Sequence, residues 1–314
     1  MKKILIIIIV LFCVMIILPT ALVICIPNAK KPLMSEKQSK NKPVVFVKHH
    51  DSGKIESHML EAYLIGVLAA EMPASFHEEA LKAQAVAART FIYNAMQSEE
   101  NDTAHPGADV CTDSSHCQAW LSEEDMVEKQ GKEWYNTYYS KLMNAVKSTE
   151  GEIVTYNYEP IVAVFHSTAS GRTENSEDVW GGSYPYLKSV ESTGDEESPK
   201  FSSTVTVEKT EVCRVLGVTD AKAYDVVRSE GGAVLTINIG GYLFKGSDIR
   251  SYFNLNSSNF EIEETENDFV FHVKGCGHGV GLSQYGANSM AKEGKTYQDI
   301  LTTYYTDVTL TKSW

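Results

Sequence analysis

The spacing of apolar residues changes near residue 151, and this change limits the fold that the chain can adopt. Before it, residues 58–70, 78–97 and 133–148 carry apolar side chains at the three- and four-residue spacing of amphipathic helices. After it, apolar and polar residues mostly alternate, which is typical of strands with one buried face. Helices followed by strands predict an α+β domain, in which helical segments pack with antiparallel β hairpins, rather than a parallel α/β sheet.

The second half of the chain is predicted to contain short strands and short helices. A hairpin is expected over residues 152–158 and 161–166, turning at Glu159-Pro160, and Gly240-Gly241 is a typical two-residue hairpin turn. The further strands are expected at 203–207, 233–239, 242–245, 260–264 and 269–274, and the helices at 209–216, 247–253, 283–293 and 297–305.

An uncharged segment near the N-terminus predicts a membrane anchor. Ile4 to Pro27 contains no charged residue and is flanked by lysines. As a helix it would extend roughly 36 Å, more than the ~30 Å hydrocarbon core of a bilayer. Because no small-x-small cleavage site is evident, residues 1–27 are expected to be a short cytoplasmic start and an uncleaved transmembrane helix. Residues 28–50, rich in Lys, Pro, Ser and Asn, are the predicted linker, and 51–314 the extracytoplasmic domain.

The charge of the chain restricts its partners. The formal net charge is -13, and no basic stripe occurs in the body of the chain. Nucleic-acid binding depends on Lys and Arg that neutralise phosphates, so nucleic acid is not an expected partner. A weakly charged polymer such as a glycan is compatible with this charge.

Glu71 is the first candidate for chemistry. Pro73 excludes the preceding residue from the α region, so Glu71 lies at or near the end of the first helix. Apolar neighbours and the negative end of the helix dipole both disfavour a carboxylate there, which should raise the pKa of Glu71. A carboxylic acid that keeps its proton near neutral pH can act as a general acid. The alternative is a surface glutamate at a helix end.

Two cations on the following helix are candidate substrate contacts. Arg89 lies within an Ala-rich run, and Lys82 lies one turn after Glu78. The alternatives are a structural ion pair inside the helical hairpin for Arg89, and a solvated i,i+4 pair with Glu78 for Lys82.

A loop with its own chemistry follows the second helix. His105, Cys111, His116 and Cys117 fall within 13 residues. Two histidines and two cysteines are the ligands that Zn²⁺ prefers in structural sites, and four protein ligands leave no open position for catalysis. One structural zinc ion is therefore predicted. The alternative is a disulfide between Cys111 and Cys117, which an exported compartment permits but which leaves both histidines unexplained.

Three segments of the chain resemble one known family. Residues 71–93, EMPASFHEEALKAQAVAARTFIY, closely resemble the catalytic segment of the stage II sporulation protein D family, and the similarity recurs at 161–190 and 275–305. The resemblance implies a membrane-anchored lytic transglycosylase that cuts MurNAc–GlcNAc bonds to 1,6-anhydro-MurNAc ends, with Glu71 as its single acid/base. It implies action on strands that the partner amidase, sporulation protein P, has stripped of stem peptides. It further implies a sporulation membrane protein complex and a place on the mother-cell side of the intermembrane space during forespore engulfment.

The later segments supply the remaining candidate substrate contacts. Small hydroxyl residues and aromatic rings between 165 and 190 suit sugar binding, and Ser167 is one candidate. Tyr186 and Lys188 are expected on one face of a short strand and are glycan contacts by resemblance. In the glycine-rich segment from Gly275, His278 and Gln284 are candidates, although His278 is as well explained as a core histidine.

Two other functions stay open. A hydrolase that uses water would need a second carboxylate, for which Glu174 and Asp178 are the candidates. A non-catalytic peptidoglycan-binding scaffold would keep the aromatic and glycine-rich surfaces and would not need Glu71.

Overall fold

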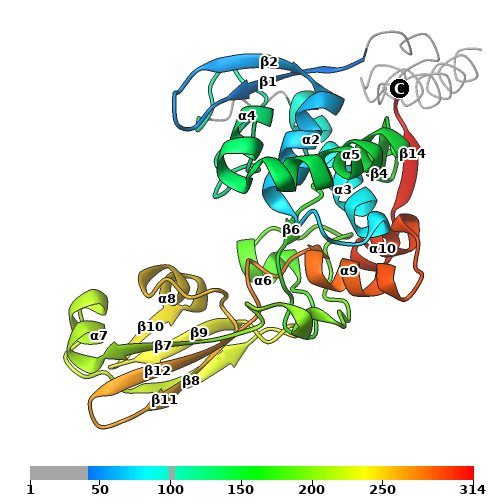
Figure 1. Ribbon diagram of the computed structural model, residues 1–314. Coiled ribbons are helices and arrows are strands. Elements are labelled where there is room, and N and C mark those ends of the chain that lie inside the picture. Colours follow the sequence, from blue (N-terminus) through cyan, green and yellow to red (C-terminus); the bar gives the residue numbers. More distant parts are fainter. Residues whose placement is uncertain (1–41, 99–102) are drawn as a thin grey trace, which may run out of the picture. The chain divides into compact units, whose positions relative to one another are not determined.

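A computed structural model describes residues 42–98 and 103–314 (Figure 1). The predicted anchor, and the predicted linker up to residue 41, lie outside the described residues. None of the helices within the described ranges is both long enough and apolar enough to cross a membrane.

The folded domain begins earlier than predicted. Residues 44–48, assigned to the linker, form β1 (Val44–Lys48). The alternate residues Val45 and Val47 are fully buried. β1 pairs antiparallel with β2 (Ile55–Met59) and parallel with β3 (Val110–Cys111). The strand is short and follows a polar, proline-containing segment, so composition hid its alternation.

The helices of the first half pack around α3 (Glu78–Gln97), as Figure 1 shows. Their positions confirm the three predicted helices to within two residues at each end. Alanines supply many of the buried residues of α3, and their small side chains let neighbouring helices approach closely. The elements in contact with α3 include α2 (Leu60–Glu71), α5 (Lys132–Ser148), α9 (Gln284–Lys292), α10 (Tyr297–Tyr304) and β4 (Glu152–Tyr156).

Arg89 lies at the centre of this helical core. It is 0% exposed, and its Nε and Nη2 donate to the two carboxylate oxygens of Glu61 at 2.8 and 2.7 Å. Its remaining donors reach the backbone carbonyls of Val146 and Glu152. Glu61 and Glu71 are ten residues apart on α2, or roughly 15 Å. With no exposed surface, Arg89 cannot touch a substrate as predicted; it forms the structural ion pair that was the alternative.

Removal of the Arg89 side chain should strongly destabilise the protein. Glu61 is only 15% exposed, so Arg89→Ala leaves a largely buried carboxylate without its partner. Breaking such a pair from one side costs about 3–5 kcal/mol. The urea concentration at the midpoint of unfolding should therefore be clearly lower for Arg89→Ala than for the unmodified chain. Arg214→Ala is the control, because Arg214 is 71% exposed in its pair with Glu211 and such pairs contribute at most about 1 kcal/mol. Equal losses in the two variants would contradict this account.

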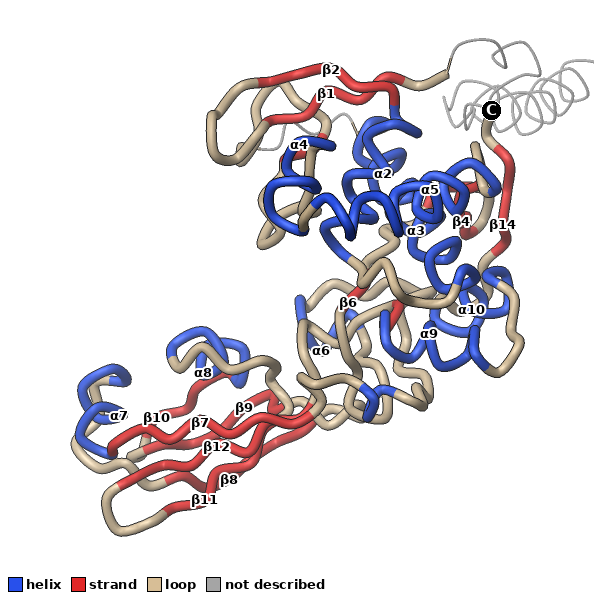
Figure 2. The backbone as a smooth tube through the Cα atoms, viewed as in Figure 1, coloured by secondary structure: helices blue, strands red, loops and turns tan. Residues whose placement is uncertain are grey.

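Residues 201–274 build a second hydrophobic core around Phe260, Phe269 and Phe271. Figure 2 shows how strands concentrate there. The segment returns to its starting point, since the Gly275 N–H donates to the Phe201 carbonyl at 2.8 Å. The segment contains two three-stranded antiparallel sheets. The strand order of the first is β11 (Phe260–Glu264), β12 (Asp268–Lys274), β7 (Ser202–Glu208), and that of the second is β10 (Tyr242–Lys245), β9 (Val234–Ile239), β8 (Ala223–Arg228). Two helices, α7 (Lys209–Leu216) and α8 (Gly246–Tyr252), complete it.

The hairpin predicted over 152–158 and 161–166 forms only in part. β4 pairs with the short β5 (Glu159–Pro160) and, on its other edge, with β14 (Thr309–Lys312). The chain then leaves this sheet, and β6 (Phe165–His166) pairs in parallel with β13 (Leu282–Ser283). The remaining short elements are α4 (Glu123–Asp125), the π-helix Met126–Gln130, α6 (Ser176–Trp180) and the 3-10 helix Asp195–Glu197. Mixed helices and antiparallel sheets thus agree with the α+β prediction.

Candidate functional site

Glu71 is the last residue of α2 and is partly buried. Burial raises the pKa of Glu71 to about 7, while the backbone N–H of Ala119, which donates to Oε1 at 2.5 Å, acts in the opposite direction. A group with this pKa holds a proton for much of the time at neutral pH and can also release it. Both properties suit a residue that acts first as a general acid and then as a base.

The loop that contacts Glu71 is fixed along α2. The Leu121 N–H donates to the carbonyl of Gly66 at 3.2 Å. A Cβ at Gly66 would collide with the Trp120 indole and the Leu121 carbonyl, so only glycine permits this approach. The ring of Tyr63 stacks on Trp120 with centroids 5.7 Å apart. The sequence indicated a loop here but not its contact with α2 and Glu71, although a glycine inside an apolar helix was a signal for close backbone approach.

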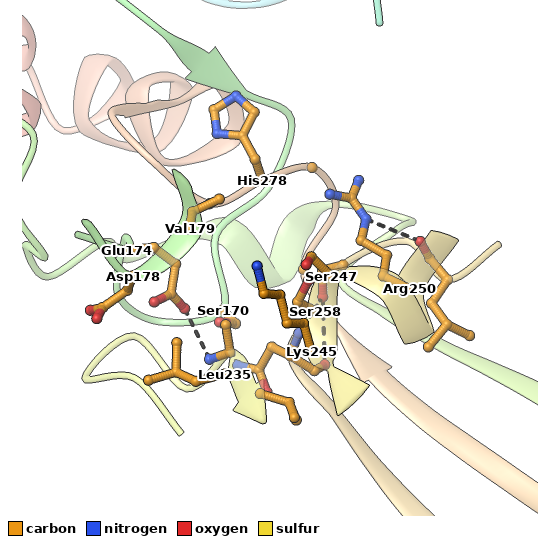
Figure 3. Close-up of a pocket in the computed structure, with 18 of the residues that line it drawn as sticks. Ser170, Glu174, Asp178, Val179, Leu235, Lys245, Ser247, Arg250, Ser258 and His278 are labelled. Carbon is orange, nitrogen blue, oxygen red and sulfur yellow. Dashed lines mark hydrogen bonds between the residues drawn. The ribbon is translucent and has the colours of Figure 1, made fainter. Parts of the chain in front are cut away.

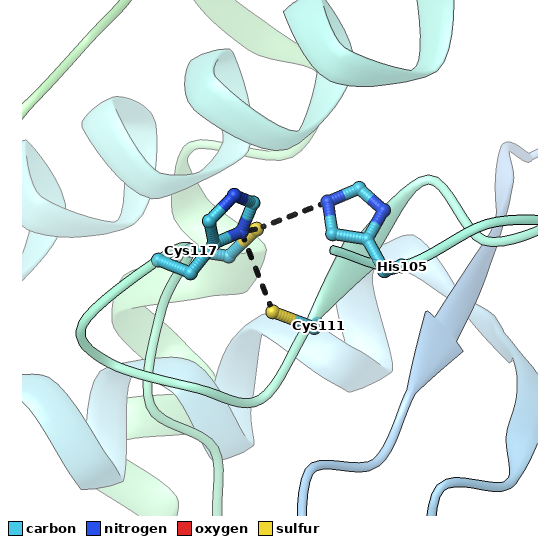
Figure 4. A group of neighbouring side chains, drawn as sticks. His105, Cys111 and Cys117 are labelled. Carbon is cyan, nitrogen blue, oxygen red and sulfur yellow. Dashed lines mark hydrogen bonds between the residues drawn. The ribbon is translucent and has the colours of Figure 1, made fainter. Parts of the chain in front are cut away.

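The four predicted metal ligands converge at the start of the same loop (Figure 4). The Sγ of Cys117 lies 3.5 Å from His105 Nε2 and 3.3 Å from His116 Nδ1, and the Sγ of Cys111 lies 3.7 Å from His116 Nδ1. All four ligand atoms lie within 4.8 Å of one another. A tetrahedral Zn²⁺ with bonds of about 2.0–2.3 Å needs ligand atoms roughly 3.3–3.8 Å apart. The donor set therefore fits this ion.

A further detail favours a metal site over the disulfide alternative. His105 Nδ1 lies 3.0 Å from the Ala108 carbonyl, an arrangement that fixes the tautomer and leaves Nε2 as the ligand atom. Cys117 precedes Ala119 by two residues, so the cluster lies immediately before the N–H that contacts Glu71.

Lys82, Tyr186 and Lys188 make contacts within the protein. Lys82 Nζ pairs with Glu78 at 3.0 Å, as its alternative proposed, and also with Glu79 at 2.8 Å. The buried Tyr186 hydroxyl accepts the Val162 N–H at 3.0 Å. Lys188 pairs with Glu177 at 2.7 Å. The short strand expected to align Tyr186 with Lys188 is a turn, because Pro185 cannot donate to a ladder.

The other predicted contacts lie near the parallel strands β6 and β13. Ser167 Oγ lies 3.2 Å from the Thr168 hydroxyl. Gln284 is buried and donates to Gln84 at 3.4 Å. The ring of His278 packs on Trp180 with centroids 5.1 Å apart, and burial lowers the pKa of His278 to about 4. His278 is therefore neutral at physiological pH.

His278 also lines a large cavity, shown in Figure 3. This cavity has a volume of 690 Å³, and charged residues of both signs line it, among them Glu174, Asp178, Lys245 and Arg250. Burial raises the pKa of Glu174, whose Oε1 accepts the Ala233 N–H at 3.0 Å. Glu71 is not among the described residues that line this cavity. Glu174 and Asp178, the candidates for the second carboxylate of a hydrolase, thus line a cavity that Glu71 does not line.

Comparison with known proteins finds relatives that are similar over most of the chain. Residues 48–156 match the model of a family described as SpoIID, Stage II sporulation protein. Stage II sporulation protein D of Bacillus subtilis is 45% identical over 255 residues, which cover 80% of this chain and 74% of that protein. The protein of the same name from Bacillus amyloliquefaciens is 40% identical over 275 residues, 86% of this chain and 78% of that protein. A B. subtilis protein named Amidase enhancer is 27% identical over 309 residues, 79% of this chain and 40% of that protein.

The structure is that of an α+β protein with a partly buried carboxylate, Glu71, at the end of a helix. With the similarity just given, the chain belongs to the stage II sporulation protein D family, a family of sporulation proteins.

Proposed function

We propose that the chain is a lytic transglycosylase that cleaves MurNAc–GlcNAc bonds of stem-peptide-free peptidoglycan strands during forespore engulfment. The observation that carries this proposal is Glu71, a partly buried carboxylate whose pKa is raised to about 7 and whose position a backbone N–H fixes. In the proposed reaction the substrate supplies its own nucleophile, so no second carboxylate is required, unlike in the usual glycosidases with two carboxylates.

In the proposed reaction, Glu71 first donates its proton to the glycosidic oxygen while the bond from that oxygen to the muramoyl C1 breaks. The carboxylate that results then accepts the proton of the muramoyl C6 hydroxyl, whose oxygen attacks C1 of the same sugar. A 1,6-anhydro ring forms, no water is consumed, and Glu71 ends in its starting protonation state. The Ala119 N–H, at 2.5 Å from Oε1, stabilises the carboxylate between the two transfers.

One zinc ion is proposed at His105, Cys111, His116 and Cys117. When bound, Zn²⁺ would cross-link the loop and, with four protein ligands, would have no open position for chemistry. These four residues hold the segment that leads to Ala119, and so they position Glu71 rather than react.

The location and the partners are proposals of the same kind. Residues 1–27 would anchor the chain by one transmembrane helix, with the domain on the mother-cell side of the intermembrane space. The relative named Amidase enhancer supports a functional link to an amidase. The proposed partner is the sporulation protein P amidase, within a sporulation membrane protein complex.

Mass analysis of the products tests the proposal. Glycan strands freed of stem peptides and incubated with the chain should give ends that are one water lighter than reducing ends. Products with reducing ends would favour a hydrolase that activates water with a second carboxylate. The absence of cleavage, with binding to the strands retained, would favour the peptidoglycan-binding scaffold.

A further inference from the structure

A second group of metal-binding side chains lies on the β1–β2 hairpin. Val45 pairs with His58 and Val47 with Glu56, so these side chains lie on one face. His49 follows β1 and continues its alternation on the same face. Two imidazoles and one carboxylate therefore lie on one face of the hairpin, with His49 after β1 and the other two residues on β2.

The ligand atoms of this group have the separations of a metal site. His49 Nε2 lies 3.4 Å and His58 Nε2 lies 3.9 Å from the same carboxylate oxygen of Glu56. One ligand atom from each residue can be chosen so that all three lie within 4.8 Å of one another. For bonds of about 2.0–2.2 Å, tetrahedral nitrogen and oxygen ligands should be roughly 3.3–3.6 Å apart. The 3.9 Å separation of His58 Nε2 from Glu56 exceeds this range, so the His58 ring would move closer when a metal ion binds.

The surroundings of the histidines leave polar atoms unsatisfied. The Nε2 atoms of His49 and His58 are buried and make no hydrogen bond, and their nearest polar contact given above is the Glu56 carboxylate. Both rings contact Trp120, with centroids 5.2 and 5.5 Å apart. Trp120 Nε1 and the hydroxyl of Tyr63, which is 1% exposed, also lack partners. Buried nitrogens without partners are costly, and a metal ion would satisfy both imidazoles.

We propose that His49, Glu56 and His58 form a second divalent-metal site, distinct from the cysteine-containing cluster. Two imidazoles and a carboxylate suit borderline ions such as Zn²⁺, Co²⁺ or Ni²⁺. Three protein ligands leave at least one coordination position open, unlike a closed site of four. Glu56 is 53% exposed, so the ion can exchange with solution. Through Trp120, the site joins the hairpin to the loop that contacts Glu71.

Cobalt binding distinguishes the two sites in the full-length chain, purified in detergent. The reduced, metal-free protein should bind two equivalents of Co²⁺ at micromolar free metal, measured by equilibrium dialysis. One equivalent should show thiolate-to-cobalt charge-transfer absorption from Cys111 and Cys117. The other should show only d–d bands, because its ligands are nitrogen and oxygen.

Single substitutions identify the residues that bind the second equivalent of Co²⁺. His49→Ala and His58→Ala should each lower the stoichiometry from two to one and leave the charge-transfer band intact. The control is His272→Ala, because His272 also pairs with a glutamate on a neighbouring strand, Glu263, at 3.0 Å but belongs to no metal-binding group among the described residues. This variant should keep two equivalents.

A stoichiometry of one in the unmodified chain would overturn the proposal. So would a second equivalent that survives in both histidine variants. If a histidine variant loses both equivalents because its packing on Trp120 fails, Glu56→Gln decides. Its half-exposed side chain can change without disturbing the core. If this variant loses only the Co²⁺ equivalent that shows no charge-transfer absorption, the site is supported. If it still binds two equivalents, the proposal is overturned.

Discussion

Glycan cleavage should fall by at least about a hundredfold when Glu71 is replaced by Gln, the scale of a lost general acid/base. Gln keeps the size of the side chain and an oxygen that can accept the Ala119 N–H, but it has no proton to donate to the glycosidic oxygen. The fold and the metal content should be unchanged. Release of anhydro-MurNAc ends from stem-peptide-free strands, followed over time, measures the loss.

The pH dependence and a matched variant identify the group responsible. Glu71 must start protonated, so kcat/KM should decline as pH rises through about 7, the value to which burial raises the pKa of Glu71. Glu78→Gln is the control: Glu78 is 53% exposed, and Lys82 keeps its bond to Glu79 in that variant. Near-normal cleavage by Glu71→Gln, or an equal loss in the control, would remove Glu71 from its proposed role.

Loss of the metal cluster should be the second large effect. Cys117→Ser should release one equivalent of zinc, lower the thermal midpoint and reduce cleavage, because the loop that carries Ala119 then loses its metal cross-link. Structural Zn²⁺ contributes about 10–16 kcal/mol in zinc-finger peptides, so a loss of several kcal/mol is expected. Elemental analysis and thermal unfolding of the same samples measure both quantities.

Cys213→Ser is the matched control for this substitution, since Cys213 is a free, partly buried cysteine outside the loop. It should keep the metal and the thermal midpoint. A disulfide between Cys111 and Cys117 makes the opposite forecast: a reductant would destabilise the loop, a chelator would not, and His116→Ala would have no effect. A zinc content near zero in protein purified without added metal, with both cysteines oxidised, would exclude the metal.

The sequence predicted best those elements whose pattern is long and regular. α3 spans Glu78–Gln97 as predicted, because its buried residues recur at helical spacing over twenty positions. β8 was missed, since nearly all its residues are exposed and a bulge near Asp225, which has a φ of 50°, interrupts the alternation. Residues 161–164 were predicted as a strand from composition, but the tertiary pairing of β6 with β13 takes the chain out of that hairpin.

In the candidate site, too, residues close together in the sequence were predictable and contacts between distant residues were not. The convergence of His105, Cys111, His116 and Cys117 was predictable because the four residues lie within 13 positions and share a preference for the same ion. The contact from Ala119 to Glu71 joins residues 48 positions apart and uses a backbone N–H, which no residue type reveals. Arg89 was misjudged because a lone cation in a helix carries no sign of its partner, and Glu61 is on another helix. The histidines of the hairpin become neighbours only through strand register.

The hydrogen bond between Gly275 and Phe201 has a consequence for the history of this chain. Residues 201–274 leave the helical part and rejoin it at nearly the same place, and they carry their own core. If residues 201–274 were removed, a short turn could join the two ends that remain at little cost in chain entropy. A segment of this kind can be lengthened, exchanged or deleted by recombination while α2 and the loop at Glu71 stay unchanged.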